Sequence, residues 1–131
     1  MKINSTVLEK ALQSLNAVLV MERDEANIVR DSAIQRFEYT YGLAVKFIER
    51  QLENMLAIPD DVAGMSFHDL IRTAAEKDIV DNPVLWFEYR KKRNITSHTY
   101  DEAKAEEVYS ILQDFAKSAG YMLERIKRLN S

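Results

Sequence analysis

The sequence of 131 residues contains no cysteine, only three glycines, two prolines and two histidines. Without cysteine there can be no disulfide, thiolate metal site or cysteine nucleophile, and this composition fits a reducing compartment. So few glycines and prolines leave an all-β sandwich or barrel without the residues that normally form its many reversals. With two histidines and no cysteine, we expect no zinc or other metal site. The scarcity of turn-forming residues therefore favours a helical fold.

Long apolar runs are also missing, since the longest one spans only residues 17–21. A membrane helix needs about 20 apolar residues, so we expect no membrane span. The first residues turn polar at once and lack the apolar centre of a signal peptide, which predicts a cytoplasmic protein. The net charge of −3 argues against indiscriminate binding of nucleic acid, although it leaves room for a local basic site.

Hydrophobic residues make up 47% of the chain and charged residues 30%, which is ordinary for a globular protein with a real core. No internal repeat, low-complexity tract or linker is visible. The length corresponds to one domain. We therefore expect residues 1–131 to form a single helical domain.

Apolar spacings of three and four residues predict two helices in the first half of the chain. The first begins near Thr6, where Glu9 completes a capping-box pattern, and ends near Arg23. The second runs from about 28 to 56 and would be roughly 43 Å long. Its core stripe is Ile34, Phe37, Tyr41, Val45, Ile48, Leu52 and Met55.

Three further helices are predicted in the second half. Ser66 with Asp69 opens a short helix that stops near Ile79. Asn82 followed by a proline restarts the chain as a helix that continues toward His98. Thr99 and Glu102 form another capping-box pattern, and the last helix continues to residue 129 with alternating apolar steps of four and three. We expect an all-α, four-helix up-and-down bundle with a short extra helix.

The long helix carries a second apolar face. Tyr39, Leu43 and Phe47 lie opposite its core stripe, because successive residues turn by about 100°. One helix in a small bundle cannot bury both faces internally, so we predict that these residues form the interface of a two-fold homodimer. The alternative is that the short helix or a loop covers them.

A basic turn contains the densest functional chemistry in the sequence: Arg90, Lys91, Lys92 and Arg93. Asn94 and His98 follow, and a continuous helix would place them on one face, where the amide can bond the imidazole. Arg93 lies about 140° from His98 on an ideal helix. The two converge on one ligand only if the helix ends near Ser97 or a second subunit supplies half of the site.

This grouping suits phosphodiester chemistry without a metal. A guanidinium stabilises charge on phosphate oxygens, and a histidine can move a proton to or from a ribose hydroxyl. Tyr100 is a poor nucleophile unless a partner supplies a base, and it is a candidate acceptor of a modification. From spacing alone, a plainer interpretation is favoured, in which the basic turn is a solvated face, His98 caps a helix and Tyr100 packs across the turn.

Two segments resemble known signatures. Residues 30–40, RDSAIQRFEYT, resemble the first signature of the nucleotidyltransferase substrate-binding family, and residues 93–102, RNITSHTYDE, resemble its second. The second is also similar to the Arg-x4-His-x-Tyr element of the HepT-like branch of the HEPN superfamily. The family usually has an acidic residue and a tryptophan where this chain has Gly42 and Val45, so local packing and docking of a partner are expected to differ there.

The resemblance implies an all-α homodimer that works with a separate MNT-type nucleotidyltransferase. It implies a metal-independent endoribonuclease toxin, with the partner as antitoxin adding AMP to Tyr100. By resemblance, Arg93 stabilises the phosphate, His98 moves the proton and Asn94 supports the site. The chain itself needs no cofactor, whereas its partner uses ATP or another nucleotide. RNA contact is expected at the basic turn, through Arg90, Lys91 and Lys92.

Two other functions remain open. The older family name implies a catalytically silent bundle that presents a substrate to the nucleotidyltransferase. A purely structural helical dimer is the second alternative.

Overall fold

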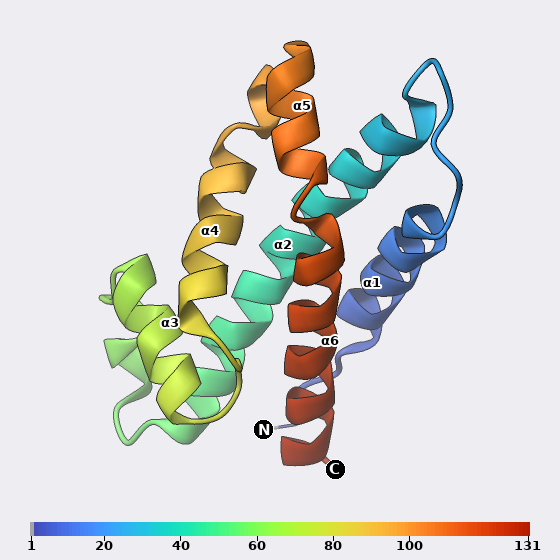
Figure 1. Ribbon diagram of the computed structural model, residues 1–131. Coiled ribbons are helices and arrows are strands. Elements are labelled where there is room, and N and C mark those ends of the chain that lie inside the picture. The colour runs from blue at the N-terminus through green and yellow to red at the C-terminus, as the bar shows by residue number, and fades with distance from the viewer. Residues whose placement is uncertain (1) are drawn as a thin grey trace.

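The computed structural model describes residues 2–131, which form α-helices and two short 3₁₀ helices, with no strand among them. In Figure 1, α1, α2, α4 and the α5–α6 pair alternate in direction, and α3 is a short extra helix beside α4. The all-α prediction of four main helices running up and down with one short addition is confirmed. The helices are α1 (Thr6–Leu19), α2 (Ile28–Met55), α3 (Phe67–Glu76), α4 (Pro83–Asn94), α5 (Glu102–Tyr109) and α6 (Leu112–Leu129), with η1 (Pro59–Asp61) and η2 (Thr96–His98) as the 3₁₀ helices.

The centre of the core is a cluster of aromatic rings from α2, α4 and α6. The ring of Phe115 lies 4.9 Å from that of Phe37 and 5.3 Å from that of Tyr89, both nearly perpendicular to it. Trp86 packs edge to face against Tyr89 at 5.4 Å. The buried hydroxyls of Tyr89 and Ser118 share a hydrogen bond of 2.6 Å. Aromatic pairs in such geometry contribute more than the area that they bury, so the cluster fixes the position of α4 against α2 and α6.

Four predicted helix starts are confirmed, and the first of them is that of α1 at Thr6. The Ser66 side chain accepts a hydrogen bond from the Asp69 N–H at the start of α3, and Asn82 accepts one from the Val84 N–H at the start of α4. The second predicted helix corresponds to α2, which begins at Ile28. There, the sequence did not identify the capping residue: the Asp24 carboxylate accepts hydrogen bonds from the first N–H groups of the helix.

The first predicted helix is wrong in its cap and its end. Ser5 occupies the cap position without a side-chain hydrogen bond, and the Thr6 N–H donates to Asn4 Oδ1 instead of Thr6 capping through its own hydroxyl. The helix ends at Leu19, well before the predicted Arg23, and Val20 is already 84% exposed. An apolar side chain that stays exposed gives no packing energy to continue the helix.

The helix boundaries after residue 90 also differ from the prediction. α4 ends at Asn94 instead of continuing to His98, and η2 follows it. Asp101 caps α5 in place of Thr99, because its carboxylate accepts from the Ala103 and Lys104 N–H groups. The last helix is broken at 110–111, where the Ser110 hydroxyl donates to the Glu107 carbonyl oxygen. Such side-chain bonds compete with the helical pattern.

The premise of the predicted dimer face is wrong at Phe47, which is only 3% exposed within one chain. The Tyr39 hydroxyl bonds the Ser14 hydroxyl of α1 at 3.1 Å, although its side chain stays 43% exposed. Leu43 is half-buried. α2 buries both faces because α1 packs against one and α5 and α6 pack against the other.

Across residues 2–131, the helices are too short or too polar to cross a membrane.

Candidate functional site

The end of α4 is closed by a small hydrogen-bonded turn around Thr96. The Thr96 hydroxyl donates to the Arg93 carbonyl oxygen at 2.8 Å and accepts from Arg93 Nη1 at 3.3 Å. Thr96 is 5% exposed, so this turn is anchored in the interior. The Thr99 hydroxyl in turn donates to the Thr96 carbonyl oxygen. The chain therefore leaves the α4 axis in a defined way and carries the following residues outward.

His98 and Tyr100 come together at the surface beyond this turn. His98 Nδ1 lies 3.4 Å from the Tyr100 hydroxyl oxygen, and the two rings are nearly perpendicular. Which group donates depends on the imidazole tautomer. Both side chains are exposed, and Tyr100 is 83% exposed. The imidazole and the phenol are thus accessible to a large substrate and to a modifying enzyme.

The predicted hydrogen bond between Asn94 and His98 does not form. α4 stops at Asn94, so the helical spacing that would place the two side chains on one face is lost. In the part of the chain that the structure describes, the imidazole faces Tyr100, whereas Arg93 bonds Thr96. One chain therefore brings His98 and Tyr100 together but leaves Arg93 and Asn94 on the other side of the turn.

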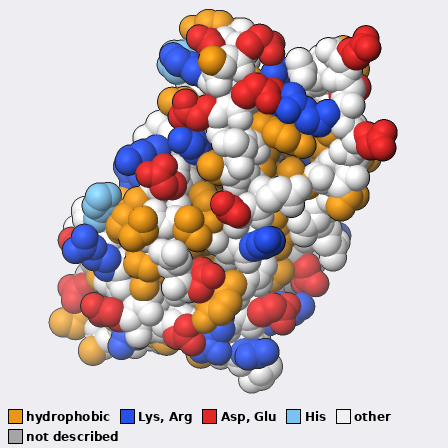
Figure 2. Space-filling view, viewed as in Figure 1, with side chains coloured by type: hydrophobic (Ala, Val, Ile, Leu, Met, Phe, Trp, Pro, Cys, Tyr) orange, Lys and Arg blue, Asp and Glu red, His pale blue; other side chains and the backbone are white. Residues whose placement is uncertain are grey.

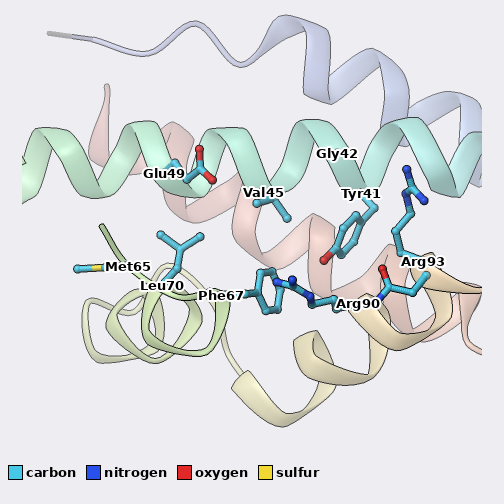
Figure 3. Close-up of a pocket in the computed structure, with 10 residues that line it drawn as sticks. Tyr41, Gly42, Val45, Glu49, Met65, Phe67, Leu70, Arg90 and Arg93 are labelled. Atoms are coloured by element: carbon cyan, nitrogen blue, oxygen red, sulfur yellow. The ribbon is translucent and has the colours of Figure 1, made fainter. Parts of the chain in front are cut away.

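The four cations of the basic turn face different surroundings. Lys91 pairs with Glu88 at 3.2 Å and Lys92 with Glu107 of α5 at 3.0 Å. The Arg90 guanidinium lies over the Phe67 ring, 4.4 Å from its centre. Figure 2 shows the result, with basic and acidic side chains next to each other over α4. The two arginines point toward α2 and α3 (Figure 3), and the lysine charges are partly balanced by carboxylates.

Sequence reasoning missed the buried Arg30, which joins the start of α2 to the start of α5. Its guanidinium is 2% exposed and contacts three carboxylates. Nη1 bonds Glu102 at 2.6 Å and Glu106 at 3.0 Å, and Nε bonds Asp31 at 2.9 Å. Arg23 adds a second cation to Glu106. Glu102 comes two residues after Tyr100, so these ion pairs hold the segment that presents the imidazole and the phenol.

The ion pairs shift the titration of their members in the expected directions. Hydrogen bonds from Arg23 and Arg30 lower the pKa of Glu106 to about 2, and the hydrogen bond from Arg30 lowers the pKa of Glu102. The pKa of Arg30 is raised, chiefly by its hydrogen bond to Glu102 and against its own burial. Glu102 and Glu106 therefore serve as counter-ions of buried Arg30 and not only as a general acidic bias at a helix start.

A pocket of about 520 Å³ opens between α2, α3 and α4 (Figure 3). Arg93 and Asn94 line it together with Arg90, so the two arginines of the basic turn, and not its lysines, face this pocket. Val45 and Gly42 form part of its α2 wall, and a Cβ atom added at Gly42 would meet nothing within 4 Å. The other lining residues are Tyr41, Glu49, Met65, Phe67 and Leu70. Tyr41 and Val45 belong to the apolar stripe that predicts core positions of α2, so the sequence pattern gave no sign of this pocket.

Tyr41 shows how polar the arginine side of the pocket is. Burial raises the pKa of its phenol to about 12, while the charges of Arg90 and Arg93 act in the opposite direction. Its hydroxyl points toward Arg90 in Figure 3. No side chain or backbone group within residues 2–131 bonds this hydroxyl. A hydroxyl that lines a pocket beside two cations is a natural hydrogen-bond partner for a ligand oxygen.

Metal ligands do not cluster in the described part of the chain: no group of three His, Asp or Glu side chains there is arranged to hold an ion. His68 stacks on Phe87 with a ring separation of 4.1 Å and is exposed.

Known proteins resemble this chain along nearly its whole length. The family model described as "Nucleotidyltransferase substrate binding protein like" matches residues 4–128. A Haemophilus influenzae protein (strain ATCC 51907 / DSM 11121 / KW20 / Rd) named "Probable ribonuclease HepT" is 36% identical over 139 aligned positions, which cover 98% of this chain and 95% of that protein.

Two solved structures have the same fold. The first is a Haemophilus influenzae protein described as revealing the fold of a substrate binding domain of a nucleotidyltransferase; it is 34% identical, with a TM-score of 0.87 over 95% of this chain and 99% of that one. The second, from Thermus thermophilus, is 30% identical, with a TM-score of 0.76 over 91% of this chain and 98% of that one. The family match and these relatives show that the chain belongs to the nucleotidyltransferase substrate-binding protein family.

Proposed function

We propose that this protein is a metal-independent endoribonuclease of the HEPN type, a toxin that an MNT-type nucleotidyltransferase neutralises by transferring AMP to Tyr100. Its relationship to a protein named as a probable ribonuclease and to a nucleotidyltransferase substrate binding domain supports both halves of the proposal. The observation that carries it is the distance of 3.4 Å between His98 Nδ1 and the Tyr100 hydroxyl oxygen, with both groups exposed.

The chemistry needs only groups that the chain possesses. His98 takes the proton of a ribose 2′-hydroxyl, whose oxygen then forms a bond to the adjacent phosphorus. The bond from phosphorus to the 5′-oxygen breaks, and that oxygen takes up a proton from water, which leaves a 2′,3′-cyclic phosphate and a 5′-hydroxyl, while His98 later returns its proton to the solvent. Arg93 stabilises the negative charge that builds up on the phosphate oxygens, with Asn94 beside it. No metal ion takes part in this scheme.

Modification of Tyr100 blocks the site at which the RNA phosphate binds. The phenol oxygen attacks the α-phosphorus of ATP in the partner's active site, and pyrophosphate leaves. Because the hydroxyl lies next to the imidazole, the attached AMP puts a phosphodiester and a nucleoside where the RNA phosphate has to bind. Repulsion between the two phosphates and the loss of space then both prevent binding.

A second copy of the chain is part of the proposal. Within one chain Arg93 bonds Thr96 while His98 faces Tyr100, so the guanidinium and imidazole are not focused on one point. A two-fold homodimer with its axis near the ends of the two α4 helices gives each phosphate an arginine from one copy and a histidine from the other. On α2, Tyr39 and Leu43 remain accessible enough to contribute to that interface, whereas Phe47 does not.

Expression of the chain without a nucleotidyltransferase tests the nuclease. We expect growth arrest, and we expect purified protein to cleave single-stranded RNA in the presence of EDTA. His98→Ala abolishes both effects. His68→Ala is the matched control, because it removes an exposed histidine from α3 and leaves arrest and cleavage unchanged. If the unaltered chain neither arrests growth nor cuts RNA, the nuclease proposal is wrong.

Mass spectrometry tests the modification. Incubation with an MNT-type nucleotidyltransferase and ATP should add the mass of one AMP unit to the peptide that contains Tyr100, and Tyr100→Phe should remove this product. RNA cleavage should fall in proportion to the modified fraction. A modified Tyr100 with undiminished cleavage contradicts the proposed inhibition.

The alternative function is that of a catalytically silent subunit that binds a substrate for the nucleotidyltransferase. The pocket of about 520 Å³ beside Arg90 favours it, since that volume is ample for a small molecule. Under this alternative, His98→Ala leaves all activities of the pair unchanged, whereas substitutions in the pocket reduce the nucleotidyltransferase activity.

A further inference from the structure

The pocket between α2, α3 and α4 has two chemically different halves. Tyr41, Arg90 and Arg93 lie in one half of the close-up in Figure 3, while Glu49, Leu70 and Met65 lie in the other. Glu49 follows Tyr41 by eight residues on α2, which corresponds to about 12 Å along the helix axis. A ligand that fills the pocket therefore meets two guanidinium groups and a phenol at one end and a carboxylate at the other.

The cationic half is prepared for a phosphate. The Arg90 guanidinium is held over the Phe67 ring at 4.4 Å, and this contact restrains it without using its N–H donors on a carboxylate. The nearby Tyr41 hydroxyl has no hydrogen-bond partner within residues 2–131. Arg93 contributes a second cation whose side chain donates only one weak hydrogen bond, of 3.3 Å, to Thr96. Guanidinium groups with free donors bind phosphate oxygens better than other common acceptors.

The middle of the pocket and its half around Glu49 suit a flat base with an amino group. Val45 lies between the arginines and Glu49 in Figure 3, and Leu70 lies on the side of Glu49, so both provide apolar surface there. No ion pair joins Glu49 to another residue of the described chain. A carboxylate accepts hydrogen bonds but cannot donate them. It therefore favours a base edge with an exocyclic amino group, such as that of cytosine, and disfavours the carbonyl oxygen of uracil.

We infer that this pocket binds a nucleotide, with its phosphate at Arg90, Arg93 and Tyr41 and an amino-bearing base against Val45 and Glu49. The nucleotide is either a free mononucleotide or one residue of an RNA strand. The inference rests on the proposed function only through Arg93, which the two sites share, and nucleotide binding does not require His98. The small residues Gly42 and Val45 are what leave room for it, because a larger side chain at either position would project into the pocket.

Calorimetric titration with CMP and UMP tests the inference, since the two ligands differ only at one base edge. We expect CMP to bind about tenfold more tightly than UMP, the discrimination typical of one good base-edge contact. Glu49→Gln should abolish that preference while it leaves the shape of the pocket unchanged. Equal affinities for CMP and UMP in the unaltered protein, or a preference that survives Glu49→Gln, would overturn the assignment of the base.

Val45→Trp tests the pocket itself. The indole fills the space between the two halves, and we expect the affinity for CMP to fall at least about tenfold. Lys46→Trp is the matched control, because it adds the same side chain at the next, exposed position of α2 and should leave binding unchanged. Circular dichroism shows whether either variant has lost its fold, and Glu49→Gln provides the test if Val45→Trp does not fold.

Two further titrations show whether the ligand is a free nucleotide or an RNA residue, and whether the pocket binds it independently of His98. A short 2′-O-methyl oligocytidylate cannot be cleaved, so its binding can be measured. If this oligomer binds and CMP does not, the pocket holds an RNA residue. If CMP alone binds, the pocket holds a free nucleotide. Failure of both ligands to bind, or binding that Val45→Trp does not weaken, overturns the inference. His98→Ala should bind as the unaltered protein does, which keeps this result independent of whether the protein cuts RNA.

Discussion

Arg30→Met should lower the free energy of unfolding by about 2–3 kcal/mol. Methionine retains the length and apolar stem of the side chain but removes the guanidinium, which is 2% exposed and contacts Asp31, Glu102 and Glu106. Hydrogen bonds to charged groups contribute about 1.5–3 kcal/mol each when taken singly. The three carboxylates are between 46% and 72% exposed and regain water, so the cost stays at or below the 3–5 kcal/mol typical of a stranded buried charge.

Urea denaturation followed by circular dichroism measures this loss. Arg72→Met is the matched control, since it makes the same substitution at an exposed position of α3 and should change stability by no more than about 0.5 kcal/mol. A loss for Arg30→Met as small as that of the control would refute the reasoning, because it would mean that the ion pairs only offset the cost of burying the guanidinium.

The reverse substitution sharpens the test. Changing both Glu102 and Glu106 to glutamine leaves a buried cation with Asp31 as its remaining charged partner, so this double variant should be at least as destabilised as Arg30→Met. The triple variant should lose less free energy of unfolding than Arg30→Met and the double glutamine variant lose together, because both sets of substitutions remove the same interaction. Strict additivity would show that Arg30 and the glutamates act independently.

Three other predictions follow from single contacts. The pKa of Glu106 is lowered from 4.5 to about 2, so the stability that this group contributes is present above pH 4.5 and is lost as the pH falls toward 2; urea midpoints of the unaltered protein and Glu106→Gln should therefore converge in acid. Tyr89→Phe strands the buried Ser118 hydroxyl and should cost about 1–2 kcal/mol in urea denaturation, part of which Ser118→Ala restores. Asp101→Ala removes the cap of α5 and should cost about 1 kcal/mol in thermal unfolding, whereas Asp101→Asn should cost much less.

The helix starts that could be predicted from the sequence are those with local causes. Ser66 and Asn82 cap α3 and α4 as predicted because each bonds an N–H only two or three residues away. Thr99 followed by Glu102 carries the same kind of signal, yet Asp101 caps α5. A capping box needs the Glu102 carboxylate to return to the Thr99 backbone, but that carboxylate bonds Arg30, which comes 72 residues earlier. A contact over that distance cannot be predicted from local pattern.

The same limit applies to the candidate site. Sequence spacing singled out the segment from the basic turn to Tyr100 as the candidate site, and it indicated that Arg93 and His98 could not share one helical face. The prediction that Asn94 bonds His98 assumed a continuous helix. In the structure the Thr96 turn ends the helix, and His98 lies against Tyr100 instead. The pocket was missed because Tyr41 and Val45 fit an apolar periodicity, which does not distinguish a core position from the wall of a cavity.

The two segments that resemble the family signatures are joined by an ion pair. Arg30, at the start of the first segment, bonds Glu102 at the end of the second. Tyr100 bonds His98, and the two residues that follow it are fixed, since Asp101 caps α5 and Glu102 is bound to Arg30. If the proposed nuclease is correct, loss of Arg30 should therefore slow both RNA cleavage and Tyr100 modification without removing any group that reacts. The effect should be larger than the loss of folded protein explains, because the segment that presents Tyr100 loses its anchor while the helical core stays intact.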